Sequence, residues 1–232
     1  MRLLTRRGFL AAAFLCLTAT VASALTPAQQ ATLTADLAAN TSQVGGVQVK
    51  DVEKTADNAV LVAAWYNTAT SPTYLVWRTE VPVADILDQV NWGNYTPNDA
   101  PPAATNTTQG TNDGLLYNNR ALLVQIKQTN LVTMLSGRNT FNAAKPTLRG
   151  GLNDATINLP TGTNGASRSG GWANIVTVLR RGCTNGERLY VSPSTGVGND
   201  GVAGNRGSTT NPDLLGYEGK ITDADVRASW GI

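Results

Sequence analysis

The sequence predicts an α+β protein that is mainly helical, with a small antiparallel β-sheet and with its helices packed around one long central helix. Apolar residues recur at helical spacing over the long stretch 115–135 and over several shorter stretches. Short runs of β-branched and aromatic residues lie between these stretches and indicate strands. Residues 192–213 are rich in glycine and follow neither period, which indicates an extended arm.

The central helix is predicted over residues 115–135, LLYNNRALLVQIKQTNLVTML. Leu115, Leu122 and Ile126 fall close to one face, which would be the buried one. Polar residues before the stretch offer N-cap oxygens, and Gly137 after it suits a left-handed C-terminal cap. At about 1.5 Å per residue the helix would be roughly 30 Å long. We therefore expect the other segments to bury their apolar faces against it.

The other predicted elements are shorter. The helices, in chain order, cover residues 28–39, 57–67, a segment beginning at Pro82, 147–159, 172–181 and a last segment ending at Trp230. The strands of the small sheet cover residues 73–79, 189–191 and 214–221. Arg180 and Arg181 would end a helix, where the macrodipole favours cations. Paired Gly150 and Gly151 inside a helix indicate close contact with a neighbouring element.

Residues 1–24 have the organisation of an export signal. Arg6 and Arg7, within TRRGFL, resemble the twin-arginine signature. A short apolar run follows, and Ala22 and Ala24 frame an A-x-A cleavage site. The run is too short and too rich in alanine and threonine for a stable membrane span. Residues 25–232 would then form a single globular domain. The alternative is a reading frame extended too far upstream, with translation starting near Leu25.

The composition excludes several kinds of chemistry. The chain has no histidine, which excludes Ser-His-Asp and Cys-His catalysis and His-ligated metal sites. Without Arg2, Arg6 and Arg7, 15 basic and 16 acidic residues remain and the formal net charge is −1, which does not favour nucleic acid as a partner. Cys183 is the one cysteine outside the export signal, and we expect a passive packing role for it at a helix end.

Two loops hold candidate contact residues. Trp92 and Tyr95, in the loop 91–102, could stack on a sugar or a base, although the favoured interpretation is that both pack over the central helix. Asn199, Asp200 and Arg206 lie in the arm 192–213, which we expect to order against a partner. The arm contains GxGxxG, but no helix follows it, so nucleotide binding is not predicted. The calcium-loop spacings are absent as well.

Paired carboxylates are the remaining route to an enzyme. Glu187 and Glu218 would approach one another if the arm were a hairpin, whereas Asp223 and Asp225 suit helix caps. Glycoside hydrolysis needs two carboxyl groups about 5–10 Å apart. No pattern in the sequence places a pair at that distance. We predict no enzyme activity, no cofactor and no metal site.

Seven segments between residues 25 and 225 carry a family resemblance. They are 25–30 (LTPAQQ), 76–81 (VWRTEV), 91–97 (NWGNYTP), 130–138 (NLVTMLSGR), 148–155 (LRGGLNDA), 184–189 (TNGERL) and 217–222 (YEGKIT). In this order they resemble small virion-associated structural proteins of tailed phages and prophages. The resemblance implies a head–tail (neck or connector) component that assembles with itself or with other virion proteins, and it implies no catalytic residues.

The chain departs from the family pattern at two places. Members of the family begin near the equivalent of Leu25, without an export signal, and their arm is shorter and less rich in glycine. The first hypothesis is therefore a non-enzymatic phage or prophage structural protein located in the virion. The alternative is an exported, periplasmic envelope protein that binds a ligand or partner through the Trp92 and Tyr95 loop. A hydrolase that uses paired acids is the third.

Overall fold

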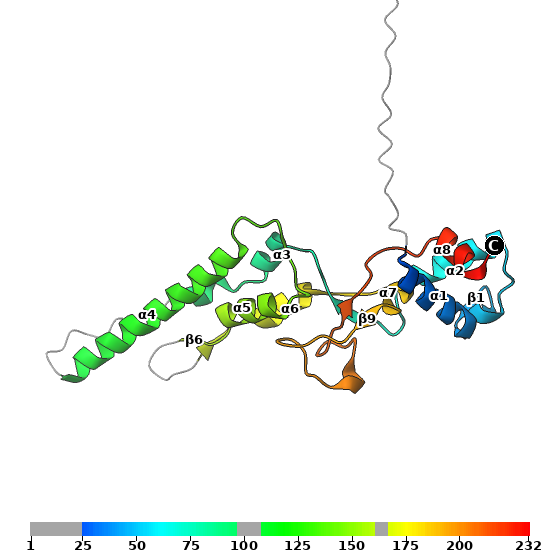
Figure 1. Ribbon diagram of the computed structural model, residues 1–232. Helices are drawn as coiled ribbons and strands as arrows, with labels where there is room; N and C mark the ends of the chain where they lie inside the picture. The colour runs from blue at the N-terminus through cyan, green and yellow to red at the C-terminus, as the bar shows by residue number, and fades with distance from the viewer. Residues whose placement is uncertain (1–24, 97–107, 161–166) are drawn as a thin grey trace, which may run out of the picture.

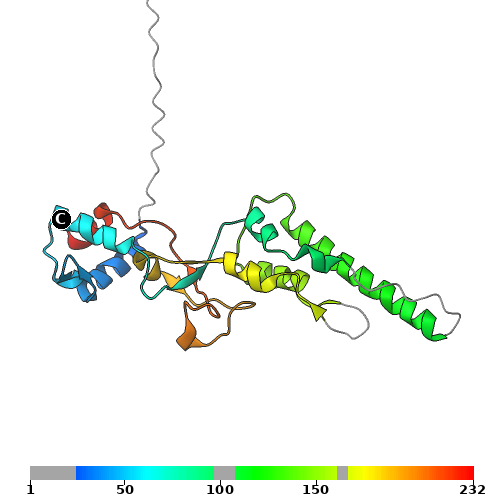
Figure 2. The ribbon, with the colours of Figure 1, turned by 180° about the vertical axis from the view of Figure 1, so that it is seen from behind.

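The computed structural model describes residues 25–96, 108–160 and 167–232, and for residues 108–117 it describes the backbone alone. Arg6, Arg7, Ala22 and Ala24 of the predicted signal lie outside the described residues. The protein is about half helical with small antiparallel sheets, which confirms the α+β class. Figure 1 shows an elongated molecule with helix α4 at one end and helices α1, α2 and α8 at the other. The view from behind in Figure 2 gives the same arrangement.

One end of the molecule is a cluster of three helices, α1 (Pro27–Ala39), α2 (Ala56–Tyr66) and α8 (Asp223–Trp230). Threonines cap each N-terminus, and those of α1 and α8 belong to capping boxes. The three helices bury a shared apolar core that includes Leu33, Leu37, Val62, Tyr66, Ile221 and Val226. Two short elements join α1 to α2: the hairpin β1 (Gln43–Val44) with β2 (Val47–Gln48), and the 3₁₀ helix η1 (Val49–Asp51).

A second apolar core lies between α3 (Val83–Asp88), α5 (Pro146–Thr156), α6 (Trp172–Val178) and the C-terminal part of α4 (Thr108–Leu135). Its members include Trp77, Val124, Leu131, Phe141, Leu152, Ile175 and Leu179. Helix α4 contributes nothing to the core of α1, α2 and α8 within the described part of the chain. The expectation that all helices pack around α4 is therefore wrong, because the sequence pattern does not specify which helix pairs form.

The face of α4 that is buried differs from the predicted face. Val124, Leu131 and Leu135 are buried, whereas Leu122 is 54% exposed and Ile126 is 45% exposed. Residues two apart on a helix point about 200° apart, so Leu122 and Val124 lie on opposite sides. The helix is apolar on both sides, and the neighbouring elements cover only one of them. Of the glycine pair, Gly151 does approach α4, since a Cβ there would lie 2.8 Å from Met134 Cε, but Gly150 has open space around it.

Within the described residues, the strands form five two-stranded antiparallel sheets. Strand β3 (Leu75–Trp77) pairs with β8 (Arg180–Gly182), and β9 (Val191–Ser192) pairs with β10 (Leu214–Leu215). The others are β4 (Val81–Pro82) with β5 (Thr140–Phe141) and β6 (Leu159–Pro160) with β7 (Ser167–Arg168). The prediction that Arg180 and Arg181 end a helix is wrong. Helix α6 ends at Val178, and the arginines instead join β3 through backbone hydrogen bonds.

Three short elements complete the structure described. The 3₁₀ helix η2 (Trp92–Tyr95) follows α3, and the 3₁₀ helix η3 (Ala203–Asn205) lies within the glycine-rich segment. Helix α7 (Asn185–Arg188) follows β8 and is capped by Thr184 and Glu187 in a capping box. The predicted strand 214–221 stops at Leu215, after which Gly216 donates its backbone N–H to the Tyr190 carbonyl at 2.8 Å.

Candidate functional site

The glycine-rich segment 192–213 folds back onto the molecule around one buried arginine. Arg149 of α5 is fully buried, and its Cζ lies 4.2 Å from the centroid of the Trp77 ring. Its guanidinium donates hydrogen bonds to the carbonyls of Ala143 (2.6 Å), Val197 (2.9 Å) and Thr195, and to Ser194 Oγ (3.2 Å). The bonds to residues 194, 195 and 197 hold the segment against α5, so it is not extended where it leaves β9.

Asn199 and Asp200, two of the predicted contact residues, form hydrogen bonds within the protein. Asn199 Oδ1 accepts a hydrogen bond from Trp77 Nε1 at 3.0 Å, and Asn199 Nδ2 donates to the Pro212 carbonyl at 2.9 Å. The carboxylate of Asp200 accepts from the Val202 backbone N–H at 2.8 Å and from Thr210 Oγ1 at 2.6 Å. Both side chains hold the segment's own turns together.

Arg206, the third predicted contact in this segment, pairs with a buried carboxylate. Its Nε and Nη2 donate to Asp213 Oδ2 at 2.9 and 2.6 Å, and the Tyr74 hydroxyl donates to the same oxygen. Burial, reinforced by this bond, raises the pKa of Tyr74 to about 12, so the phenol stays protonated at neutral pH. Asp213 Oδ1 is buried and accepts no hydrogen bond from the described residues. The cluster fastens the end of the segment to β3.

Trp92 and Tyr95 lie in η2 and differ in exposure. Tyr95 is buried, and its hydroxyl donates to the Ala155 carbonyl at 2.9 Å. Trp92 is 41% exposed, and its Nε1 donates to the Leu87 carbonyl at 3.2 Å. The ring centroids are 5.9 Å apart and the planes are tilted by 44°. Tyr95 therefore packs inward, as the favoured interpretation expects, while Trp92 keeps an exposed ring surface. Among the described residues, no hydrogen bond joins this pair to Asn199, Asp200 or Arg206.

The acid pair Glu187 and Glu218 comes together around Arg181. Arg181 donates to both oxygens of Glu187 at 2.8 Å and to Glu218 Oε1 at 2.9 Å. Burial acts to raise the pKa of Glu218, but hydrogen bonds from Thr79 and Arg181 outweigh it and lower that pKa. Both carboxylates thus belong to an ion cluster around Arg181, and the lowered pKa of Glu218 is the opposite of the raised pKa that a hydrolase's general acid needs.

Cys183 is buried between strand β8 and the N-cap of α7, so it does not follow the end of the helix predicted over residues 172–181. Burial raises the pKa of its thiol, and neighbouring Glu187 adds to the rise. The thiolate is the reactive form of cysteine, and a raised pKa keeps it scarce at neutral pH. The burial and the raised pKa are those of a packed, unreactive thiol.

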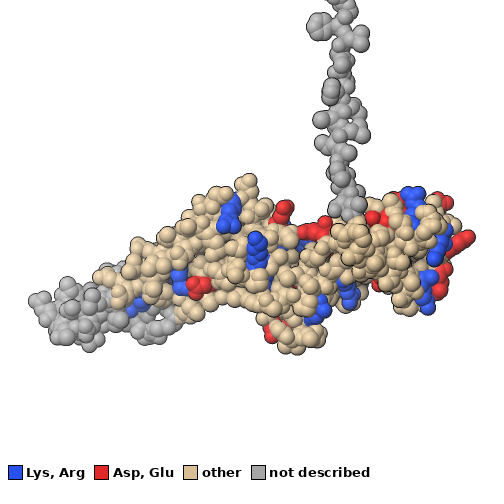
Figure 3. Space-filling model, in the orientation of Figure 1, with Lys and Arg blue, Asp and Glu red and all other residues tan. Residues whose placement is uncertain are grey.

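The exposed side of α4 presents large apolar side chains, two of which, Leu122 and Ile126, the sequence pattern had assigned to the buried face. We call this the α4 apolar surface; its members are Leu122, Leu123, Ile126 and Val132. On the face shown in Figure 3, charged side chains gather over the end that holds α1, α2 and α8, and few lie along α4. The periodicity of apolar residues in the sequence predicts a stripe of such residues along α4. It does not show whether another element covers that stripe.

Within the described residues, no group of three or more acidic or sulfur ligands is placed to hold a metal ion. None of the helices in this part of the chain is long and apolar enough to cross a membrane. Comparison with protein-family models gave no match, and comparisons with curated proteins and with solved structures gave none either.

Proposed function

We propose that this chain is a non-enzymatic structural protein of a phage or prophage that assembles with copies of itself at a head–tail interface. The observation that carries the proposal is the α4 apolar surface. Leu122, Leu123 and Ile126 are each close to half exposed on a helix that extends away from the rest of the molecule (Figure 1). Leu122 and Ile126 lie one helical turn apart, so their side chains are neighbours on the helix surface, and contiguous exposed apolar patches mark interaction sites.

The apolar composition of this surface favours a protein partner over a nucleic acid. Association that buries a large apolar side chain gains about 1.5–3 kcal/mol for each one removed from water. A nucleic-acid partner would need clustered cations, and the apolar residues of this surface provide none. Other virion proteins could bind the same surface, and the family resemblance of segments such as 130–138 supports a place in the virion.

We predict that charged substitutions on the α4 apolar surface weaken self-association of the chain. In the double variant Leu122→Glu/Ile126→Glu, the dissociation constant for self-association should rise at least about 100-fold, because two apolar contacts are lost and charges are buried. Light scattering after size-exclusion chromatography, over a range of protein concentrations, measures this. Leu61→Glu is the matched control, since Leu61 on α2 is 54% exposed, as Leu122 is. A wild-type chain that stays monomeric at all concentrations, or a double variant that assembles normally, would contradict the proposal.

The second candidate is an exported envelope protein that binds a ligand or partner through η2. The exposed ring of Trp92 favours it, whereas buried Tyr95 cannot contribute a stacking surface. Mass spectrometry of the natural protein in cell fractions and in purified induced particles separates the candidates. We expect a chain in particles and none in the periplasm. A chain that starts at Leu25 in the periplasmic fraction would instead favour the envelope protein.

A further inference from the structure

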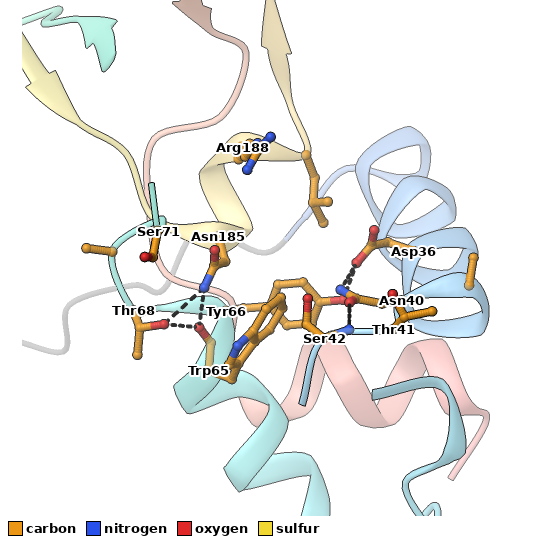
Figure 4. A pocket seen from close by; sticks show the side chains of 13 residues that line it. Asp36, Asn40, Thr41, Ser42, Trp65, Tyr66, Thr68, Ser71, Asn185 and Arg188 are labelled. Atoms are coloured by element: carbon orange, nitrogen blue, oxygen red, sulfur yellow. Dashed lines mark hydrogen bonds between the residues drawn. The ribbon is translucent and has the colours of Figure 1, made fainter. Parts of the chain in front are cut away.

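A polar pocket of about 650 Å³ lies at the end of the molecule opposite α4. Its walls come from three separated parts of the sequence: the end of α1 with the residues after it, the end of α2 with the residues after it, and helix α7. Figure 4 shows Asp36 and Asn40 on one side, Thr68 and Asn185 on the other, and the rings of Trp65 and Tyr66 between them. This volume is typical of small-molecule sites in proteins.

The α1 wall is fixed by hydrogen bonds. The Tyr66 hydroxyl donates to Asp36 Oδ2 at 2.5 Å, and Asn40 Nδ2 donates to the same oxygen at 2.8 Å. Asn40 Oδ1 in turn accepts the backbone N–H of Ser42 at 2.9 Å. Burial and the bond to Asp36 raise the pKa of Tyr66 far above its ordinary value, so the phenol remains a donor. The carboxylate is therefore held in one orientation, and its other oxygen, Oδ1, has no donor among the described residues.

The opposite wall is fixed in the same way. Asn185 Nδ2 donates to Thr68 Oγ1 at 3.0 Å and to the Trp65 carbonyl at 3.3 Å, which leaves Asn185 Oδ1 available as an acceptor. Arg188 is exposed and forms no ion pair with any described residue; its Cζ lies 5.0 Å from the centroid of the Tyr74 ring. The pocket therefore offers acceptors and donors from side chains that are already positioned.

An aromatic surface accompanies these polar groups. Trp65 lines the pocket and packs edge-on against Tyr66, with ring centroids 4.8 Å apart and planes at 72°. Its indole N–H donates to no described acceptor. Tryptophan combines a broad apolar face with one donor, which suits ligands that are apolar on one face and polar at the edge.

We propose that this pocket binds a short neutral saccharide. Sugar hydroxyls both donate and accept, which matches walls that mix carboxylate, amide, hydroxyl and guanidinium groups, and the C–H face of a pyranose packs on an indole ring. The two charged residues of the lining, Asp36 and Arg188, cancel in formal charge, so the lining has no net preference for an anion or a cation. This inference does not rest on the proposed assembly function.

Titration calorimetry of the full chain with maltotriose, cellotriose and chitotriose tests the proposal. At least one of the three should bind saturably. Asp36→Asn keeps an oxygen acceptor for Tyr66 but replaces the free acceptor Oδ1 with a donor. It should weaken saccharide binding about tenfold, because that is the contribution of one charged hydrogen bond to the affinity. Arg188→Gln, on the exposed opposite wall, provides a second variant with little risk to folding, and it should weaken binding as well.

Asp57→Asn is the matched control, because Asp57 is an exposed carboxylate of α2 that does not line the pocket. Its binding should equal that of the wild type. The proposal is overturned if none of the three saccharides binds saturably at 10 mM, about the weakest affinity that defines a site. It is also overturned if both pocket variants bind as the wild type does, or if the zwitterion glycylglycine binds more tightly than every saccharide.

Discussion

Replacing Arg149 with methionine should lower the free energy of unfolding by about 3–5 kcal/mol. The guanidinium donates five hydrogen bonds: to the carbonyls of Ala143, Thr195 and Val197, to Ser194 Oγ, and a longer one of 3.5 Å to Asn199 Oδ1. Hydrogen bonds from a charged donor contribute about 1.5–3 kcal/mol each, and carbonyls left unpaired in the interior cost more. Methionine fills much of the volume but replaces none of the bonds.

One effect opposes this loss. Burial lowers the pKa of Arg149 to about 10, which corresponds to about 3 kcal/mol of desolvation that methionine would avoid. The hydrogen bonds from the charged guanidinium together outweigh that saving, so the net effect is a loss of stability. At pH 7 the guanidinium is still charged and still a donor.

Urea denaturation, monitored by circular dichroism, measures the free energy of unfolding of the Arg149→Met variant. Arg138→Met is the control. Arg138 is exposed, and its replacement should change stability by no more than about 0.5 kcal/mol. Limited proteolysis adds a local readout, because the methionine variant should be cleaved first within 192–213. A variant at Arg149 within about 1 kcal/mol of the wild type would show that the segment is held by other contacts.

The helices were the most predictable part of the fold, because their signals are local. Thr26 and Pro27 mark the start of α1, and Thr222 caps α8, so caps and apolar spacing agree within a few residues. The position of β8 was not predictable in the same way. Arg180 and Arg181 continue the pattern of α6, and only pairing with β3, a hundred residues earlier in the chain, makes them extended.

Contacts distant in sequence also explain why the candidate sites were only partly predicted. Asn199 and Arg206 were predicted to contact a partner, and their bonds within the chain, to Trp77 and Asp213, could not be assigned from composition. Arg149 gave no signal, because an arginine on a helix normally faces water. The pocket in Figure 4 combines residues from three separate segments, so no spacing motif connects them.

Gly171→Ala should destabilise the protein by about 3–5 kcal/mol, as the sum of backbone strain and a steric clash. Gly171 precedes α6 with φ of 111°, a conformation that residues with a side chain rarely adopt. A Cβ at this position would lie 2.4 Å from the Gln89 carbonyl oxygen and 3.1 Å from the Asn91 nitrogen. Both are backbone atoms, and Asn91 is fixed because its N–H donates to the Gly170 carbonyl at 2.9 Å.

Alanine substitutions at two other glycines separate the cost of backbone strain at Gly171 from the cost of the steric clash there. Gly137 has φ of 70° with open space around it, so Gly137→Ala should cost only the strain, about 1–2 kcal/mol. Gly150 lies inside α5, also with open space, and Gly150→Ala should stabilise the protein by about 0.5–1 kcal/mol. Thermal and urea unfolding give the order of the three variants. If Gly171→Ala costs no more than Gly137→Ala, residues 89–91 move aside readily and the junction between η2 and α6 is not rigid. If it costs about 2 kcal/mol more, the close approach of these backbones fixes how α6 meets the rest of the second core.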